Sequence, residues 1–166
     1  AQSGSGWQTI TKFKNRMSIF MNQKLAVSLN QYLSDCAVEY IKLHNLHWNI
    51  VGPDFKQVHE YLETLYDGFA DVMDAIAELL KMHNVYPLAS LKSYLSVSTI
   101  EELESADYRS SAVLTSVVKD LQNLKDKAEQ IRADADEGGW YDIVSVMENQ
   151  LSDYNKTLWF LQSMAK

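Results

Sequence analysis

The stretch LHNLHWNIVGPDFKQVHEYLETLYDGFADVMDAIAELL, residues 43–80, contains the end of one helix, a turn and most of a second helix. Apolar residues recur at three- and four-residue steps on both sides of the turn, which predicts amphipathic helices over residues 25 to about 49 and 55 to about 83. In the turn, Gly52 suits the position after a helix end and Asp54 suits the N-cap of the next helix. The stretch therefore predicts two long consecutive helices.

The rest of the chain adds two more helices and one long connection. Residues 84–109 are rich in Ser and acidic residues and contain one short apolar piece at 91–95, which predicts a crossover with one or two helical turns. Ser110 or Ser111 is expected to cap a third helix, Gly138-Gly139 to end it, and a fourth is expected from about Tyr141. Four helices with a long crossover after the second favour a ferritin-like bundle over an up-down-up-down bundle. We expect an all-α fold, with the bundle domain at residues 23–166 and a basic, partly helical arm at residues 1–22.

Charge is distributed unevenly along the 166 residues, whose net charge is −7. Residues 1–34 contain four basic residues and no acid, whereas residues 35–166 contain 11 basic and 22 acidic residues. An acidic body with a basic arm is expected to contact polyanions only through the arm. The predicted DNA-binding residues are therefore the four cations of that segment: Lys12, Lys14, Arg16 and Lys24.

Two features of the sequence indicate the cellular compartment of the protein. A single cysteine, Cys36, excludes an internal disulfide framework and fits a reducing environment. No apolar run approaches the roughly 18 residues that span a bilayer. We expect a cytoplasmic protein with no membrane partner.

Histidines and carboxylates are concentrated around the predicted turn. His47 closes the first helix, His59 and Glu63 are spaced i,i+4 near the start of the second, and Asp74 and Glu78 are spaced i,i+4 further along it. Imidazole with carboxylates suits iron, manganese or zinc rather than a metal that prefers thiolates. Acidic pairs at helical spacing also occur on ordinary solvated helix faces, so the spacing alone leaves both interpretations open.

The spacing within the second helix constrains any shared site. His59 and Asp74 lie on roughly the same face but about 22 Å apart along the axis, so one chain cannot bring them to the same metal. Two antiparallel copies of this helix, related by a two-fold axis near residue 68 or 69, would bring them together. Gly68 is at that midpoint, and we expect it to permit a close helix crossing. No histidine has a glutamate three residues before it, which disfavours a di-iron centre inside the bundle.

These residues resemble the signature of the Dps family, the miniferritins that protect bacterial DNA. The resemblance covers residues 25–164, through the His-Trp, Gly-Pro-x-Phe, His-Glu and Asp-x-Ile-Ala-Glu elements of the quoted stretch and the ending KTLWFLQS at 156–163. It implies a hollow homo-dodecamer built from two-fold dimers, with a two-iron ferroxidase centre between subunits and hydrogen peroxide as the favoured oxidant.

The resemblance also assigns residues. It implies that His47, His59 and Glu63 are ligands from one subunit and that Asp74 and Glu78 come from its partner. Glu63 replaces the aspartate frequent in the family, and Leu79 replaces an arginine. The family's acidic three-fold pore would fall near the start of the last helix, with the candidates Asp134, Asp136, Glu137 and Asp142.

Four further residues have specific expectations. His44, one turn before His47, is expected to make interface hydrogen bonds, and His83 to interact with the C-terminal dipole of its helix. Cys36 is expected in the core, and Trp48 either packs or donates electrons to oxidants.

Three functions remain to be distinguished. The first is an Fe(II)-oxidising miniferritin that also binds DNA without sequence preference in the bacterial nucleoid. The second is a non-enzymatic nucleoid-compacting protein with a vestigial metal site. The third is an oligomeric helical scaffold that binds neither iron nor DNA.

Overall fold

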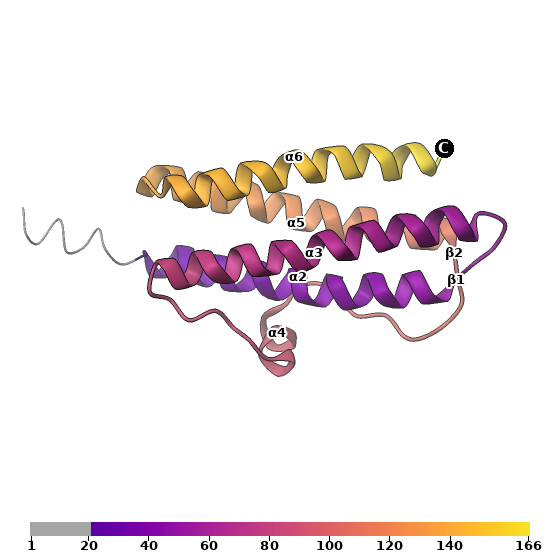
Figure 1. Cartoon of the computed structure of the whole chain (residues 1–166), viewed down its shortest axis with the longest axis horizontal. Coiled ribbons are helices and arrows are strands. Elements are labelled where there is room, and N and C mark those ends of the chain that lie inside the picture. The colour runs from indigo at the N-terminus through magenta and orange to yellow at the C-terminus, as the bar shows by residue number, and fades with distance from the viewer. Residues whose placement is uncertain (1–20) are drawn as a thin grey trace, which may run out of the picture.

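A computed structural model describes residues 21–166, which form four long helices lying side by side (Figure 1). The elements in chain order are α2 (Gln23–Asn49), β1 (Ile50–Val51), α3 (Phe55–Met82), α4 (Leu91–Val97), β2 (Tyr108–Arg109), α5 (Ser110–Gly138) and α6 (Tyr141–Met164). The connection from α3 to α5 returns along the whole bundle, so α3 and α5 run in the same direction (Figure 1). This arrangement confirms the all-α, ferritin-like fold. The predicted arm, except for Met21 and Asn22, lies outside the described residues.

The helix ends follow local chemistry, with two departures from expectation. Asn22 caps α2 by accepting hydrogen bonds from the backbone N–H groups of Lys24 and Leu25, at 2.7 and 3.3 Å. Gly139 ends α5 in the left-handed conformation, with φ of 72°. Asp54 occupies the N-cap position of α3, but its side chain makes no capping hydrogen bond.

The predicted serine cap of α5 is wrong. The N-cap residue is Arg109, which makes no side-chain cap. The reason lies in β2, which pairs in parallel with β1 through Ile50↔Tyr108 and Val51↔Arg109. This pairing holds Arg109 extended, and the helix starts with the next residue.

The core lies along the bundle axis and is built from the apolar stripes of the four long helices. Its fully buried members include Leu25, Leu29, Leu43, Leu62, Ile76, Leu80, Val117, Leu124, Ile143 and Leu161. Cys36 is also fully buried, as predicted. None of the helices within residues 21–166 has the length and apolar character needed to cross a membrane.

A buried carboxylate attaches the crossover to the bundle. Asp35 is fully buried on α2 and accepts hydrogen bonds from Ser98 Oγ at 3.0 Å and from the backbone N–H of Thr99 at 2.6 Å. Lys127 of α5 forms an ion pair with the same carboxylate. Because α2, the crossover and α5 all contact Asp35, this residue fixes the path of the chain beyond α4.

Candidate metal centre

His47, in the last turn of α2, and His59, in the second turn of α3, stack ring against ring. Their centroids are 3.7 Å apart and their planes differ by 18°. Each ring bonds to the other residue's backbone: Nδ1 of His47 lies 2.8 Å from the carbonyl oxygen of His59, and Nδ1 of His59 lies 2.8 Å from that of His47. The tight turn between α2 and α3 thus makes neighbours of two predicted ligands.

These hydrogen bonds determine which nitrogen of each imidazole is available. A carbonyl oxygen can only accept, so both Nδ1 atoms carry a proton and donate it. In the neutral ring, Nε2 then holds a free lone pair, which is the form that binds a metal. These hydrogen bonds to the backbone also fix the orientation of each ring. In metal sites, groups that hydrogen-bond to the ligating side chains orient them in the same way. The pair is therefore organised to present two Nε2 atoms.

Aromatic rings enclose this pair. Tyr66 meets His47 edge-on at 5.2 Å between centroids, and Phe55 stacks on His59 at 4.9 Å. His44 stacks on Tyr66 at 3.8 Å, and its Nδ1 bonds to the carbonyl oxygen of Tyr40 at 2.8 Å. In the chain alone, His44 therefore supports the aromatic cluster, and its predicted interface role is untested.

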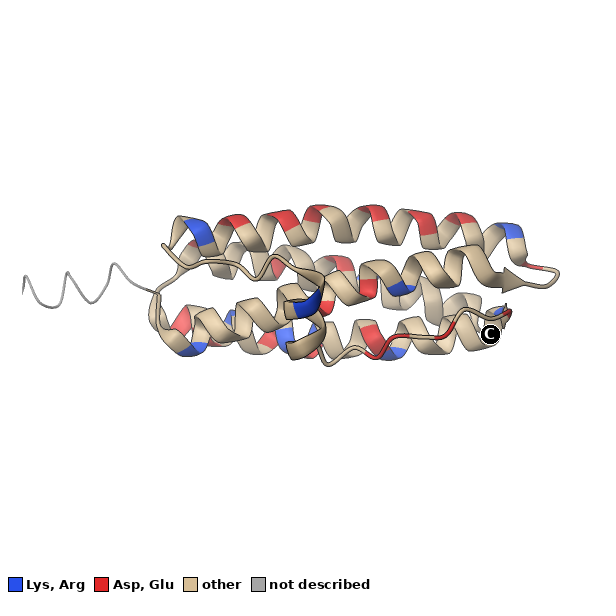
Figure 2. Cartoon of the chain, turned by 90° about the horizontal axis from the view of Figure 1, so that it is seen from below, with Lys and Arg blue, Asp and Glu red and all other residues tan. Residues whose placement is uncertain are grey.

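The carboxylates lie on one exposed stripe of α3. The stripe consists of six acids at three- and four-residue steps: Glu60, Glu63, Asp67, Asp71, Asp74 and Glu78. Figure 2 shows it as a row of red along the upper helix. At about 100° per residue, all six fall within an arc of about 80°. Glu63 is one turn from His59, whereas Asp74 and Glu78 lie near the other end of the helix.

One chain does not bring the five predicted ligands together. Within residues 21–166, no three His, Cys, Asp or Glu side chains lie close enough to hold a metal ion. His47 and His59 are in contact, Glu63 lies one turn further along α3, and Asp74 and Glu78 lie near the other end of that helix.

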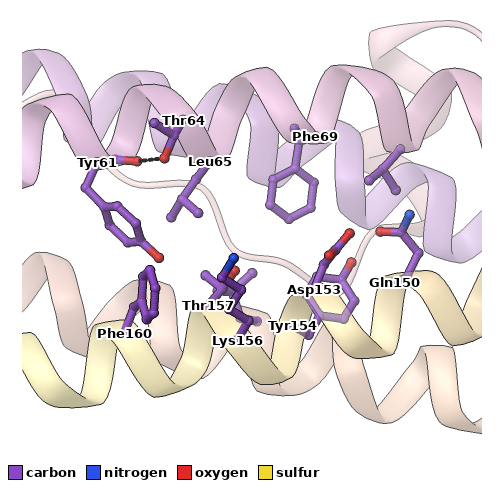
Figure 3. Close-up of a pocket in the computed structure, with 13 residues that line it drawn as sticks. Tyr61, Thr64, Leu65, Phe69, Gln150, Asp153, Tyr154, Lys156, Thr157 and Phe160 are labelled. Carbon is purple, nitrogen blue, oxygen red and sulfur yellow. Dashed lines mark hydrogen bonds between the residues drawn. The ribbon is translucent and has the colours of Figure 1, made fainter.

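The close helix crossing expected at Gly68 stays a prediction, although Gly68 lies off the ligand side of α3. Gly68 lines a groove between α3 and α6, about 100° around the helix from Asp67 of the acidic stripe. Figure 3 shows this groove, with Tyr61, Leu65 and Phe69 of α3 facing α6. The small residue near the helix midpoint on the ligand side is Ala70, which is exposed. Spacing gives the level of Gly68 along α3, but the side of the helix on which Gly68 lies faces α6 rather than the predicted ligands.

Comparisons with known proteins agree with this architecture. The ferritin-like domain family matches residues 27–166. The DNA protection during starvation protein of Brevibacillus brevis is 31% identical over 150 residues, which cover 89% of this chain and 98% of that protein. The chain belongs to the Dps family of ferritin-like proteins. The crystal structure of antigen TpF1 from Treponema pallidum has a TM-score of 0.86 and 33% identity, covering 90% of this chain and 94% of that chain.

A second solved structure indicates the chemistry of the wider superfamily. The Dps protein from Vibrio cholerae O1, described as a member of a broad superfamily of ferritin-like diiron-carboxylate proteins, has a TM-score of 0.82 and 28% identity. That match covers 87% of this chain and 90% of that chain.

The interior of this Dps-family bundle contains a polar cluster that the sequence did not predict. Lys42 Nζ lies 2.5 Å from Asp120 Oδ2, and both side chains are almost fully buried. Glu39 is fully buried close to them, and neither of its oxygens has a hydrogen-bond partner. Lys42 already neutralises Asp120, so the cluster is not arranged like the donor set of a di-iron centre. A helical wheel would have placed Glu39 and Lys42 on the buried side of α2 and Asp120 on the buried side of α5.

The pore candidates lie around the α5–α6 junction, and three of them have partners. Asp134 pairs with Lys24 at 2.9 Å, which helps to lower the pKa of its carboxyl. Asp136 pairs with Arg132 at 3.1 Å. Asp142 pairs with His83 at 2.7 Å, so His83 contacts a neighbouring helix as well as the end of α3. Glu137 is exposed.

Proposed function

We propose that this Dps-family protein is a miniferritin that oxidises Fe(II) at a centre shared by two subunits. His47, His59 and Glu63 come from one subunit and Asp74 and Glu78 from its two-fold mate. The observation that carries the proposal is the reciprocal hydrogen bonding of His47 and His59, which leaves both Nε2 atoms free. The exposed carboxylates at the far end of α3 supply the complementary donors once a second α3 runs antiparallel to the first.

The donor set suits iron oxidation. Carboxylates stabilise the harder Fe(III) ion relative to Fe(II), and a small ligand set leaves coordination positions for an oxidant. With hydrogen peroxide, two Fe(II) ions each give up one electron, and the two electrons break the O–O bond to yield two hydroxide ions. Pairing the irons consumes the peroxide without releasing a hydroxyl radical.

Assembly and storage complete the proposal. Six such dimers form a hollow homo-dodecamer in which Fe(III) is kept as a mineral, and iron enters near the α5–α6 junction. The pore residues are drawn from Asp134, Asp136, Glu137 and Asp142. The protein acts in the cytoplasm, at the bacterial nucleoid.

DNA binding is the second part of the proposal. It is supported by the basic character of residues 1–34 against an otherwise acidic chain. Twelve arms on one particle raise the avidity of individually weak contacts by roughly 10²–10⁴. Binding is expected to be independent of sequence because the contacts are to phosphates. Lys24 contributes less than the other three cations, because Asp134 already pairs with it.

The test of the ferroxidase is the double variant His47→Ala/His59→Ala. We expect Fe(III) formation, followed by absorbance after mixing with Fe(II) and hydrogen peroxide, to slow at least tenfold while the particle size is unchanged. The matched control is His83→Ala, which removes a histidine that pairs with Asp142 instead. If the double variant and the control oxidise Fe(II) at equal rates, the ferroxidase proposal fails. The remaining candidate functions are then the nucleoid-compacting protein and the scaffold.

A further inference from the structure

Helix α2 exposes three large apolar side chains on one side. Val27, Ile41 and Trp48 are 62%, 51% and 68% exposed. Their spacings are 14 and 7 residues, so they lie in line along the helix, drifting by only about 20° per heptad. A tryptophan buries 150–250 Å² when it packs, so its exposure on a single chain marks a face without a partner.

The end of this line at Val27 is a groove. It has a volume of about 440 Å³ and lies between the start of α2 and the chain that follows α3. Its walls include Ala26, Val27, Asn30, Val85, Leu88 and Val97. Asn30 fixes one wall, because its side-chain oxygen accepts a hydrogen bond from the backbone N–H of Leu88 at 2.7 Å. The groove is therefore formed before anything binds in it.

Trp48 of the same chain cannot reach this groove. Trp48 and Val27 are 21 residues apart on one continuous helix, which separates them by about 32 Å. Trp48 can therefore fill this groove only from another copy of the chain.

The two-fold axis of the proposed metal centre relates these features. The ligand positions place the axis at residues 68–69 of α3. Helices α2 and α3 are antiparallel and His47 lies level with His59, so the same axis passes α2 at residues 37–38. Rotation about it brings Trp48 of one subunit to the level of Val27 of the partner subunit. The axis was placed from the ligand spacing on α3 and the His47–His59 contact, without reference to Trp48 or the groove, yet it brings the exposed tryptophan to the level of the groove.

We propose that Trp48 binds in the groove at Val27 of the partner subunit, twice per dimer. The same rotation brings Ile41 to the level of the partner's α4, whose Leu91 and Leu95 are 71% and 52% exposed. The partner is a second copy of this chain, because the occupant and its groove are both present on one chain and a single axis joins them. The contact fixes the register of the two α3 helices, so that Asp74 and Glu78 reach the partner's histidines. This inference rests on the two-fold arrangement of the proposed function.

The first test removes the side chain. We expect Trp48→Ala to raise the protein concentration at which the particle dissociates at least about tenfold, measured by sedimentation velocity over a dilution series, because central aromatic residues dominate interface energies. Helicity by circular dichroism should be unchanged, since Trp48 is mostly exposed in the chain. Trp48→Phe retains an aromatic ring and should restore most of the association. Association of Trp48→Ala equal to that of the wild type would overturn the proposal.

The second test measures proximity in metal-free protein. In a Cys36→Ala background, the pair Trp48→Cys/Val27→Cys should give covalent dimers with a short bifunctional thiol cross-linker. Neither single-cysteine variant should give covalent dimers. In each, the two cysteines of a dimer occupy the same position on the two subunits and lie about 32 Å apart along α2. An assembled double variant that stays monomeric on a denaturing gel would refute the contact. If the double variant oxidises iron but does not cross-link, the metal centre forms without the Trp48 contact. If it cross-links but does not oxidise iron, only the proposed ferroxidase is refuted.

Discussion

Glu39 and Asp120 lie close together in the bundle interior, and Lys42 pairs with Asp120 alone. Burial, followed by the charge of Asp120, raises the pKa of Glu39 well above its ordinary value, against a smaller opposing effect of Lys42. The raised pKa favours the protonated form of Glu39 in the folded protein. With Glu39 protonated, the cluster carries one positive and one negative charge, which balance.

The raised pKa of Glu39 makes the stability of the fold depend on pH. In the unfolded chain the carboxyl ionises near pH 4.3, while in the folded protein it ionises at higher pH. Its contribution to stability is thus fully present below the unfolded pKa and is lost, by about 1.4 kcal/mol per pH unit, as pH rises towards the folded pKa. Glu39→Gln removes this loss and should stabilise the protein by roughly 1–3 kcal/mol at pH 7 but little at pH 4.5.

The measurement is urea unfolding at several pH values and one protein concentration. Glu102→Gln, which changes an exposed glutamate of the crossover, is the control for the change in net charge. A Glu39→Gln curve parallel to that of the wild type at all pH values would show that Glu39 is ionised in the folded state.

Lys42 should be much less tolerant of change. Lys42→Met leaves Asp120 as a buried and unpaired charge, which costs about 3–5 kcal/mol. Adding Asp120→Asn to the same chain should restore most of that loss in thermal or urea unfolding. Equal stability of the single and double variants would show that the ion pair does not account for the cost.

The sequence predicted helices, turns and topology because these depend on local periodicity. The stripes of α2 and α3 and the glycines at the end of α5 were sufficient to place the four long helices. The reciprocal bonds of His47 and His59 could not be predicted, since they depend on how the turn at residues 50–54 brings two helices side by side. The side of α3 on which Gly68 lies could not be predicted for a related reason. Spacing gives the level of a residue along a helix, whereas the neighbouring helices decide which side meets a partner.

Asp35 offers a prediction about the crossover. Asp35→Ala removes the acceptor of Thr99 N–H and the ion-pair partner of Lys127, so we expect a loss of about 3–5 kcal/mol in stability. The crossover near Thr99 should also become sensitive to limited proteolysis. Asp126→Ala, which changes an exposed carboxylate of α5, should alter neither. Cleavage at the same rate in both variants would mean that α4 and its flanking contacts hold the crossover without Asp35.

DNA binding is tested by deleting residues 1–20, which keeps the buried Met21 and the Asn22 cap of α2 and so leaves the bundle intact. This deletion removes Lys12, Lys14 and Arg16, whereas deletion of residues 1–6 removes no charge and serves as the control. We expect the longer deletion to abolish plasmid retardation in a gel at low salt, and the control to bind as the full chain does.

Each neutralised phosphate adds about 0.9 to the slope of log affinity against log salt, so retardation by the full chain should fall steeply as salt is added. A chelator in every lane removes divalent cations that would bridge the acidic body to phosphate. If the particle lacking residues 1–20 still retards DNA as strongly as the control under these conditions, the arm does not carry the binding.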